Sequence, residues 1–260
     1  MINLLKFEFY KLARAKSFYI FLGAALFSTF LSALVLYVAY FISKDALEET
    51  IEGFEVVNAM VNASSGTEIS ITVLSYANFT TLFGLFTAIF ICDDFSQKTI
   101  KNVYSRGFTR TQVFFAKIIA IAAAMLVAYL VVVMFGFLVG LLLFGEAGEF
   151  QGVVIYFEQF LYILAFMAFV AFVTFTFKKI AVSILFALIV PSVFATILTI
   201  IDMSIGSETF KLSLYWFGNY ELYIYAGAKM KEIIAVLAGA TAYTGIFTLL
   251  GWLVSRNNNL

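Results

Sequence analysis

The stretch IIAIAAAMLVAYLVVVMFGFLVGLLLFG, residues 118–145, decides the class of fold. It lies between Lys117 and Glu146 and contains no charged side chain. A bilayer has a hydrocarbon core about 30 Å thick, and a helix needs about 20 apolar residues to cross it, because every backbone amide must be hydrogen-bonded within the segment. The stretch therefore predicts a transmembrane helix.

Five further uncharged runs of spanning length lie on either side of this one. Hydrophobic residues make up 63% of the 260 residues and charged residues 12%, and the charges gather between the runs, unlike those of a soluble domain. The sequence predicts an all-α integral membrane protein with one transmembrane domain over residues 1–260. We expect six spans, at about 17–43, 69–92, 118–145, 159–177, 180–201 and 233–255.

Few residues in the chain suit metal binding or covalent catalysis. Histidine is absent and Cys92 is the only cysteine, so we expect no internal disulfide and no zinc or haem site. An intramembrane hydrolase would need a metal or a nucleophile and base within the spans, and the sequence does not favour one. The first uncharged run is too long for a cleaved signal sequence, so we expect a retained helix there.

The distribution of basic residues predicts the orientation. Twelve of the 16 Lys and Arg residues fall on one side of the predicted spans, and the four on the other side are Lys44, Lys211, Lys229 and Lys231. Most of the acidic residues accompany these four. The positive-inside rule then predicts that both termini lie in the cytoplasm. The formal net charge of +0 gives no support to nucleic-acid binding.

Residues 1–16 predict an amphipathic helix in the membrane interface. One face carries Ile2, Leu5, Phe9, Leu12 and Ala13 at helical spacing, and the opposite face is basic and polar. A simple lipid anchor and a surface that contacts a partner both remain open. The residues of this helix that we single out are Lys6, Phe9, Lys11 and Arg14.

The loop between the second and third spans, DDFSQKTIKNVYSRGFTRTQVFFAK, residues 93–117, predicts a short cytoplasmic helix. Asp94 with Gln97 suits an N-cap and its N3 partner, and Gly107 suits a C-terminal stop at positive φ. These signals bound a helix at about residues 95–106. Thr109 with Gln112 forms a second capping signal, from which the next helix runs into the third span.

The predicted short helix has an apolar face of Ile100, Val103 and Tyr104. Asp94, Lys98, Lys101 and Asn102 lie roughly opposite. Such a helix can lie on lipid or insert into a groove of a soluble partner, and spacing alone favours lipid.

The order of elements resembles the permease subunit of the type-two exporter class of ABC transporters. In that family the loop carries an acidic residue, a Gly-Thr-hydrophobic string, a small-residue turn, a Ser/Thr-Arg pair and a closing Gly-Lys pair. The matching residues here are Asp94, Thr99-Ile100, Arg106-Gly107, Thr109-Arg110 and Lys117. The chain departs from the pattern at Lys98 and Ala116, which stand where the family has glycine.

The resemblance implies that the short helix is the coupling helix, which rests in a cleft of an ATPase subunit. The chain has no Walker-type phosphate-binding string, and its uncharged runs hold no ionisable group to bind a driving ion. We therefore expect no catalytic activity and no cofactor in this chain, and ATP and Mg²⁺ in a separate partner. The candidate coupling residues are Asp94, Lys98, Ile100, Lys101, Val103, Tyr104, Arg106 and Gly107.

Aromatic residues are dense between the fifth and sixth spans, in KLSLYWFGNYELYIYAGAK, residues 211–229. Dense Tyr and Trp is typical of an interfacial aromatic belt. The resemblance implies instead a pair of short re-entrant helices that cap the exit of a translocation path. The candidate residues of this outer gate are Tyr215, Trp216 and Tyr220.

These features together predict the membrane subunit of an ATP-driven exporter in a bacterial cytoplasmic membrane. The chain would form half of a pathway, with a second copy or a similar permease, for a hydrophobic or amphipathic cargo. A membrane-active peptide, such as a toxin or bacteriocin, is the narrowest expectation, and its export could serve secretion or self-immunity. A non-transporting membrane sensor or assembly factor is the alternative.

Overall fold

The structure is a computed structural model, which describes residues 2–46, 79–96, 103–144, 153–205, 211–224 and 229–257. All regular secondary structure in these ranges is helical, and six of the helices are long and apolar enough to cross a membrane. The predicted all-α fold with six spans is confirmed. The helices are α1 (Ile2–Arg14), α2 (Lys16–Ala46), α5 (Phe79–Ser96), α7 (Arg110–Phe144), α8 (Val153–Phe177), α9 (Ile180–Ile205) and α10 (Met230–Asn257), with two 3-10 helices, η1 (Leu212–Tyr215) and η2 (Phe217–Leu222).

Several helices extend past the charged residues that bound the predicted spans. Helix α7 begins at Arg110 and includes Lys117, and α8 begins at Val153 and includes Glu158. Both charged side chains are buried, so they lie among other helices. A charged residue therefore does not mark the end of a helix here, because the bundle encloses it. Residues 69–78 of the second predicted span lie outside the described residues.

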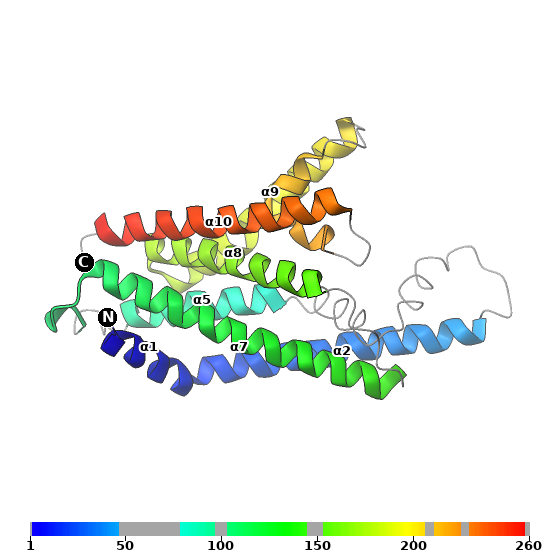
Figure 1. Cartoon of the computed structure of the whole chain (residues 1–260), viewed down its shortest axis with the longest axis horizontal. Helices are drawn as coiled ribbons and strands as arrows, with labels where there is room; N and C mark the ends of the chain where they lie inside the picture. The colour runs from blue at the N-terminus through cyan, green and yellow to red at the C-terminus, as the bar shows by residue number, and fades with distance from the viewer. Residues whose placement is uncertain are drawn as a thin grey trace.

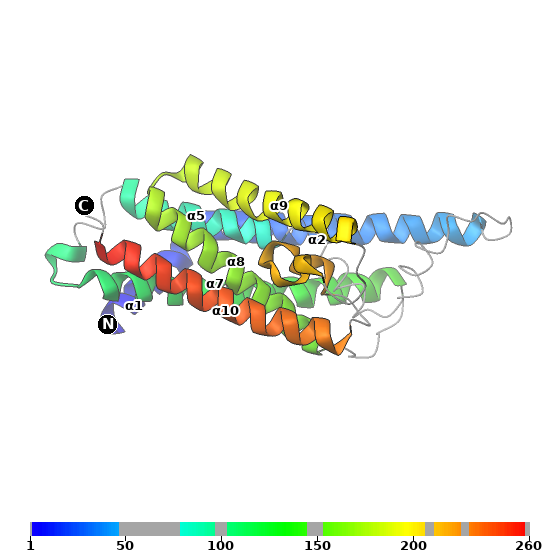
Figure 2. The ribbon, with the colours of Figure 1, turned by 90° about the horizontal axis from the view of Figure 1, so that it is seen from above.

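Most of the long helices run along one axis, α9 is inclined to them, and both termini lie at the same end of the bundle (Figure 1). Helix α8 is the central element: it packs on α10, α5, α9 and α7, and 67% of its spanning window is buried. Helices α9 and α10 lie at the periphery, where only 11% of each window is buried. Seen from the second direction, α9 and α10 lie on opposite sides of α8 (Figure 2).

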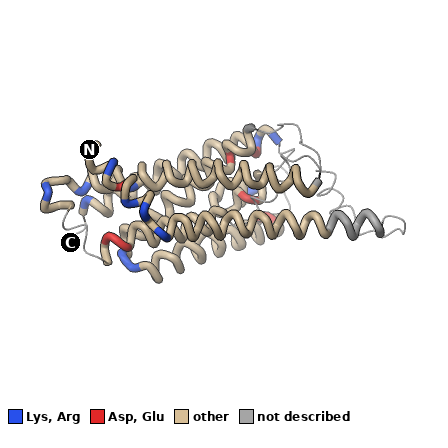
Figure 3. Tube along the Cα trace, turned by 90° about the horizontal axis from the view of Figure 1, so that it is seen from below, with Lys and Arg blue, Asp and Glu red and all other residues tan. Residues whose placement is uncertain are grey.

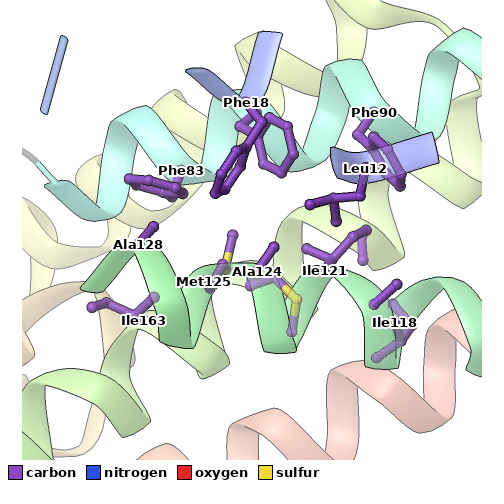
Figure 4. Packing of buried hydrophobic residues seen from close by; sticks show 14 of the residues in the cluster. Leu12, Phe18, Phe83, Phe90, Ile118, Ile121, Ala124, Met125, Ala128 and Ile163 are labelled. Carbon is purple, nitrogen blue, oxygen red and sulfur yellow. The ribbon is translucent and has the colours of Figure 1, made fainter. Parts of the chain in front are cut away.

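The core of the bundle is formed where large rings meet small side chains. On α7, Ala124 and Ala128 lie one turn apart and are buried together with Phe83 and Phe90 of α5 (Figure 4). The short alanine side chains leave room for the phenyl rings, so the two helices fill the space between them at the density of a protein interior. Gly84 acts in the same way on another face of α5, since a Cβ there would lie 2.4 Å from the ring of Phe166.

Lys and Arg residues gather at the end that carries both termini (Figure 3). We call this end the basic end and the opposite end the far end. The segment around Gly107 forms the tip of the basic end, and η1 and η2 lie toward the far end (Figure 1, Figure 2).

Candidate functional site

The loop after α5 begins differently from the sequence prediction. Asp94 lies inside α5, which continues to Ser96, so its interpretation as the N-cap of a new helix is wrong. Its carboxylate bonds instead with the amino groups of Lys117 and Lys11. Three of the candidate coupling residues, Lys98, Ile100 and Lys101, lie outside the described residues.

The second half of this loop agrees with its local signals. Val103–Ser105 is helical, and the turn closes where Gly107 N donates to Tyr104 O at 2.9 Å. Gly107 has φ of 84°, which confirms the predicted stop at positive φ. Thr109 Oγ1 accepts from Gln112 N at 3.3 Å, and Gln112 Oε1 accepts from Thr109 N at 3.1 Å. The second capping signal is therefore confirmed as a capping box at the start of α7.

We call residues 103–109 the hairpin, and its apolar side chains pack within the chain. Val103, Tyr104 and Phe108 are half-buried against a small cluster of Leu4, Val113 and Ala116. Burial raises the pKa of the Tyr104 phenol, although Arg110 and Lys117 act against the shift, so the ring stays neutral and packs as an apolar group. Arg106 and Gly107 are exposed at the tip.

A largely buried group of charges, which we call the charge cluster, joins α1, α5 and α7 at the basic end. It consists of Glu8, Lys11, Asp94 and Lys117. Lys117 is 0% exposed and Glu8 2%, and Lys117 Nζ donates to Glu8 Oε2 at 3.1 Å. Lys117 also bonds with Asp94, which in turn bonds with Lys11. Two cations and two carboxylates thus neutralise each other where α1, α5 and α7 meet.

The charge cluster was missed by sequence reasoning because Glu8 occupies the buried face of α1. That face is formed by Leu4, Glu8 and Leu12, at intervals of one turn. The apolar face predicted from the sequence is not the buried face of α1, since Ile2 is 72% and Phe9 38% exposed. The signal in the sequence is the carboxylate between two leucines at i−4 and i+4.

The other residues singled out on α1 do not meet in one site. Lys6 and Arg14 are exposed, and the Arg14 guanidinium lies over the ring of Tyr10 at 4.3 Å from its centroid. Lys11 alone joins the charge cluster. The exposed apolar and basic side chains on the outer face of α1 fit a helix in the membrane interface.

At the far end, residues 211–224 form a compact segment that we call the re-entrant turn. Asp202 at the end of α9 accepts hydrogen bonds from Leu212 N at 2.7 Å and Ser213 N at 2.8 Å, which holds the start of η1. Trp216 Nε1 donates to Pro191 O of α9 at 3.0 Å. On the other side, Tyr243 of α10 donates to Tyr215 O at 3.0 Å.

The depth of these contacts favours re-entrant helices over a simple aromatic belt. Tyr243 follows the first residue of α10 by 13 positions, which is about 20 Å at about 1.5 Å per residue. The turn therefore lies beside the middle of α10 and not at its end. Phe217 and Tyr220 are fully buried, whereas Tyr215 is 50% exposed.

Two features of this turn could not be read from the aromatic pattern. The carbonyl of Pro191, inside α9, is the acceptor for the Trp216 indole, and no aromatic pattern indicates this contact. The Tyr220 hydroxyl is buried and has no hydrogen-bond partner among the described residues.

The described residues contain no group of three or more His, Cys, Asp or Glu side chains that could hold a metal ion. Two regions with several side-chain polar contacts are the charge cluster beneath the hairpin and the re-entrant turn. The charge cluster lies at the basic end, and the turn lies toward the far end of the same helical bundle (Figure 1).

Six apolar helices with a capped basic hairpin after the second of them define a multi-pass helical membrane protein. A family model described as ABC-2 family transporter protein matches residues 4–195. The chain belongs to this family, whose members are membrane components of ABC transporters without ATPase activity of their own, and the resemblance to a type-two permease is confirmed. No curated protein and no solved structure matches the chain.

Proposed function

We propose that this chain is the permease subunit of an ATP-driven exporter in a bacterial cytoplasmic membrane. The basic end faces the cytoplasm, as the distribution of Lys and Arg favours. There the hairpin contacts a separate ATPase subunit that binds ATP and Mg²⁺. The observation that carries the proposal is the exposed tip of the hairpin, braced from below by the charge cluster.

Closure of the ATPase subunits would push on the hairpin and move the helices joined to it. Lys117 lies two turns into α7 and is bonded to carboxylates on both α1 and α5. Separating α7 from the other two helices would leave Glu8 without its ion-pair partner, and the loss of one partner of a buried pair costs about 3–5 kcal/mol. The three helices therefore move together, and the push reaches the spans.

The pathway is completed by a second copy of this chain or by a similar permease. Helices α2, α9 and α10 present large apolar side chains outward, among them Phe27, Phe194 and Leu249, which need lipid or another helical bundle as neighbours. Opposite the hairpin, the re-entrant turn with Tyr215, Trp216 and Tyr220 caps the exit. The cargo is hydrophobic or amphipathic, with a membrane-active peptide as the narrowest proposal.

Copurification tests the contact with an ATPase. A tagged chain expressed in its native host should retain an ATPase subunit, and Arg106→Glu should lose it because the charge at the exposed tip is reversed. Lys179→Glu is the matched control, since Lys179 is also exposed at the basic end but lies in the α8–α9 connection. The proposal fails if the wild-type chain retains no ATPase, or if Arg106→Glu retains it and supports export as the wild type does.

A further inference from the structure

A cavity lies toward the far end, between α5, α7, α8 and the re-entrant turn. The enclosed space is about 20 Å³, which is room for a water-sized group, and the cavity is partly open to its surroundings. One part of the lining is apolar, and the other part carries hydroxyl, amide and carboxylate groups. The lining residues are Phe79, Thr80, Tyr129, Gln159, Tyr162, Ile163, Glu221 and Ile224.

The polar part of the lining is rich in hydrogen-bond acceptors. Tyr129 Oη lies 2.9 Å from Tyr156 O and 3.1 Å from Gln159 Oε1, but a phenol has one proton and can donate to only one of them. The Tyr162 hydroxyl donates to Glu221 Oε1 at 3.3 Å, which leaves the second carboxylate oxygen for another donor. The cavity thus offers the second Glu221 oxygen as an acceptor that its phenols do not satisfy.

The described lining carries one negative charge. Among the lining residues that the structure describes, Glu221 is the only charged one. The ion pairs of the charge cluster lie at the basic end and do not reach this lining. A carboxylate beside apolar walls is stabilised by a positively charged partner, which the cavity itself does not supply.

We infer that this cavity binds a primary alkylammonium group, such as a lysine side chain or a linear amine. An ammonium has three N–H donors, which match the carboxylate, phenol and amide oxygens around the cavity. Phe79, Tyr129 and Tyr162 place aromatic rings in the lining, and Ile163 and Ile224 offer apolar surface to the methylene chain. The enclosed space fits the ammonium head alone, so the alkyl chain would extend through the opening.

The cavity is connected to the re-entrant turn in two ways. Glu221 and Ile224 belong to that turn, and the ring of Tyr162 lies edge-on to the ring of Tyr220, with centroids 6.3 Å apart. A cation in the cavity would therefore pull on the segment that we propose as the exit gate. That the ammonium belongs to the cargo, as a cationic amphipath, rests on the proposed export function, whereas the binding itself does not.

Binding can be measured without an ATPase or an export assay. The probe is n-butylammonium chloride, titrated against the full chain in lipid nanodiscs and followed by saturation-transfer NMR. We expect saturable binding. Glu221→Gln should weaken it about tenfold or more, as for the loss of a charge-assisted hydrogen bond, and Tyr162→Phe about three- to tenfold. Glu232→Gln, an acidic residue outside the cavity at the start of α10, should bind as the wild type does.

The inference is overturned if the wild-type chain shows no saturable binding, a result that needs no variant to fold. It is also overturned if neutral n-butanol binds equally well, or if sodium displaces n-butylammonium at equal concentration, which would make this an inorganic cation site. Unchanged affinity in both Glu221→Gln and Tyr162→Phe would place the binding elsewhere. Because no step involves ATP, failure of the export proposal leaves this test intact.

Discussion

The amino group of Lys117 donates a hydrogen bond to Glu8 Oε2 at 3.1 Å across 109 positions of sequence. This contact joins the first helix of the chain to the start of the third span. Both side chains are buried, and Glu8 has no other ion pair within the described ranges. Removing Lys117 would therefore leave the Glu8 carboxylate buried without a cation.

Replacing Lys117 by methionine should destabilise the protein strongly. Methionine fills most of the volume, but the Glu8 carboxylate stays buried without a cation, which costs about 3–5 kcal/mol. Thermal unfolding can be followed through Cys92, a buried thiol and the only cysteine, which reacts with a maleimide dye when the fold opens. Lys179→Met, at an exposed site, should change stability by less than about 0.5 kcal/mol.

The double variant Glu8→Gln with Lys117→Met distinguishes the buried charge from lost packing. With the carboxylate removed as well, much of the stability should return, since a neutral amide is cheaper to bury than an unpaired charge. Equal unfolding temperatures of Lys117→Met and the double variant would contradict this account of the charge cluster.

Glu8→Gln alone should loosen α1 from α7. The amide keeps the shape of the side chain but replaces a charged acceptor of Lys117 by a neutral one, which weakens a bond of about 1.5–3 kcal/mol. Hydrogen exchange of the Ile2–Arg14 amides should then become about ten- to a hundredfold faster. Lys6→Gln, on the exposed face of the same helix, should leave the exchange unchanged; similar acceleration in both variants would show that α1 is not held by Glu8.

The fold was predictable because the bilayer imposes a length that long uncharged runs reveal. Residues 118–145 and the five other runs all lie mostly within helices of the structure, apart from the part outside the described residues. The ends of the helices were not predictable in this way. Glu158 was treated as a boundary, but tertiary packing encloses it within α8.

The hairpin and the charge cluster show what local sequence signals can and cannot specify. The capping box of Thr109 and Gln112 and the stop at Gly107 involve neighbours in the chain, so the residue types alone predict them. Asp94 also has the local signal of an N-cap, but in the structure it lies inside α5 and pairs with Lys117. That partner is specified only when α5 and α7 pack together.

Trp216→Phe tests whether the re-entrant turn is held by α9. Phenylalanine keeps a ring beside Phe194 and Phe217 but cannot donate to the Pro191 carbonyl, a loss of about 0.5–1.5 kcal/mol. Hydrogen exchange over residues 212–222 should therefore become about two- to tenfold faster. Trp252→Phe is the matched control, because its indole donates to Thr111 Oγ1 near the basic end. Trp252→Phe should leave hydrogen exchange in the turn unchanged. If Trp216→Phe also leaves it unchanged, the bond from Trp216 to Pro191 does not hold the turn.

Gly239→Ala tests the contact between the re-entrant turn and α10. A Cβ at Gly239 would lie 1.8 Å from the Tyr220 hydroxyl oxygen and 2.9 Å from its Cζ, so the fully buried ring must move. Overpacking of this kind costs about 1–3 kcal/mol. Gly245→Ala, in the same helix with nothing within 4 Å of its Cβ, should instead be neutral or stabilise by up to about 1 kcal/mol.

Tyr220→Phe should rescue part of the loss in Gly239→Ala. It removes the oxygen that clashes most closely, and because that hydroxyl has no partner among the described residues, Tyr220→Phe alone should cost little stability. Unfolding temperatures of the four combinations of these two changes, read through Cys92, give the coupling between the sites. If the two effects simply add, Tyr220 does not contact Gly239 in the membrane, and the proposed position of the exit gate is wrong.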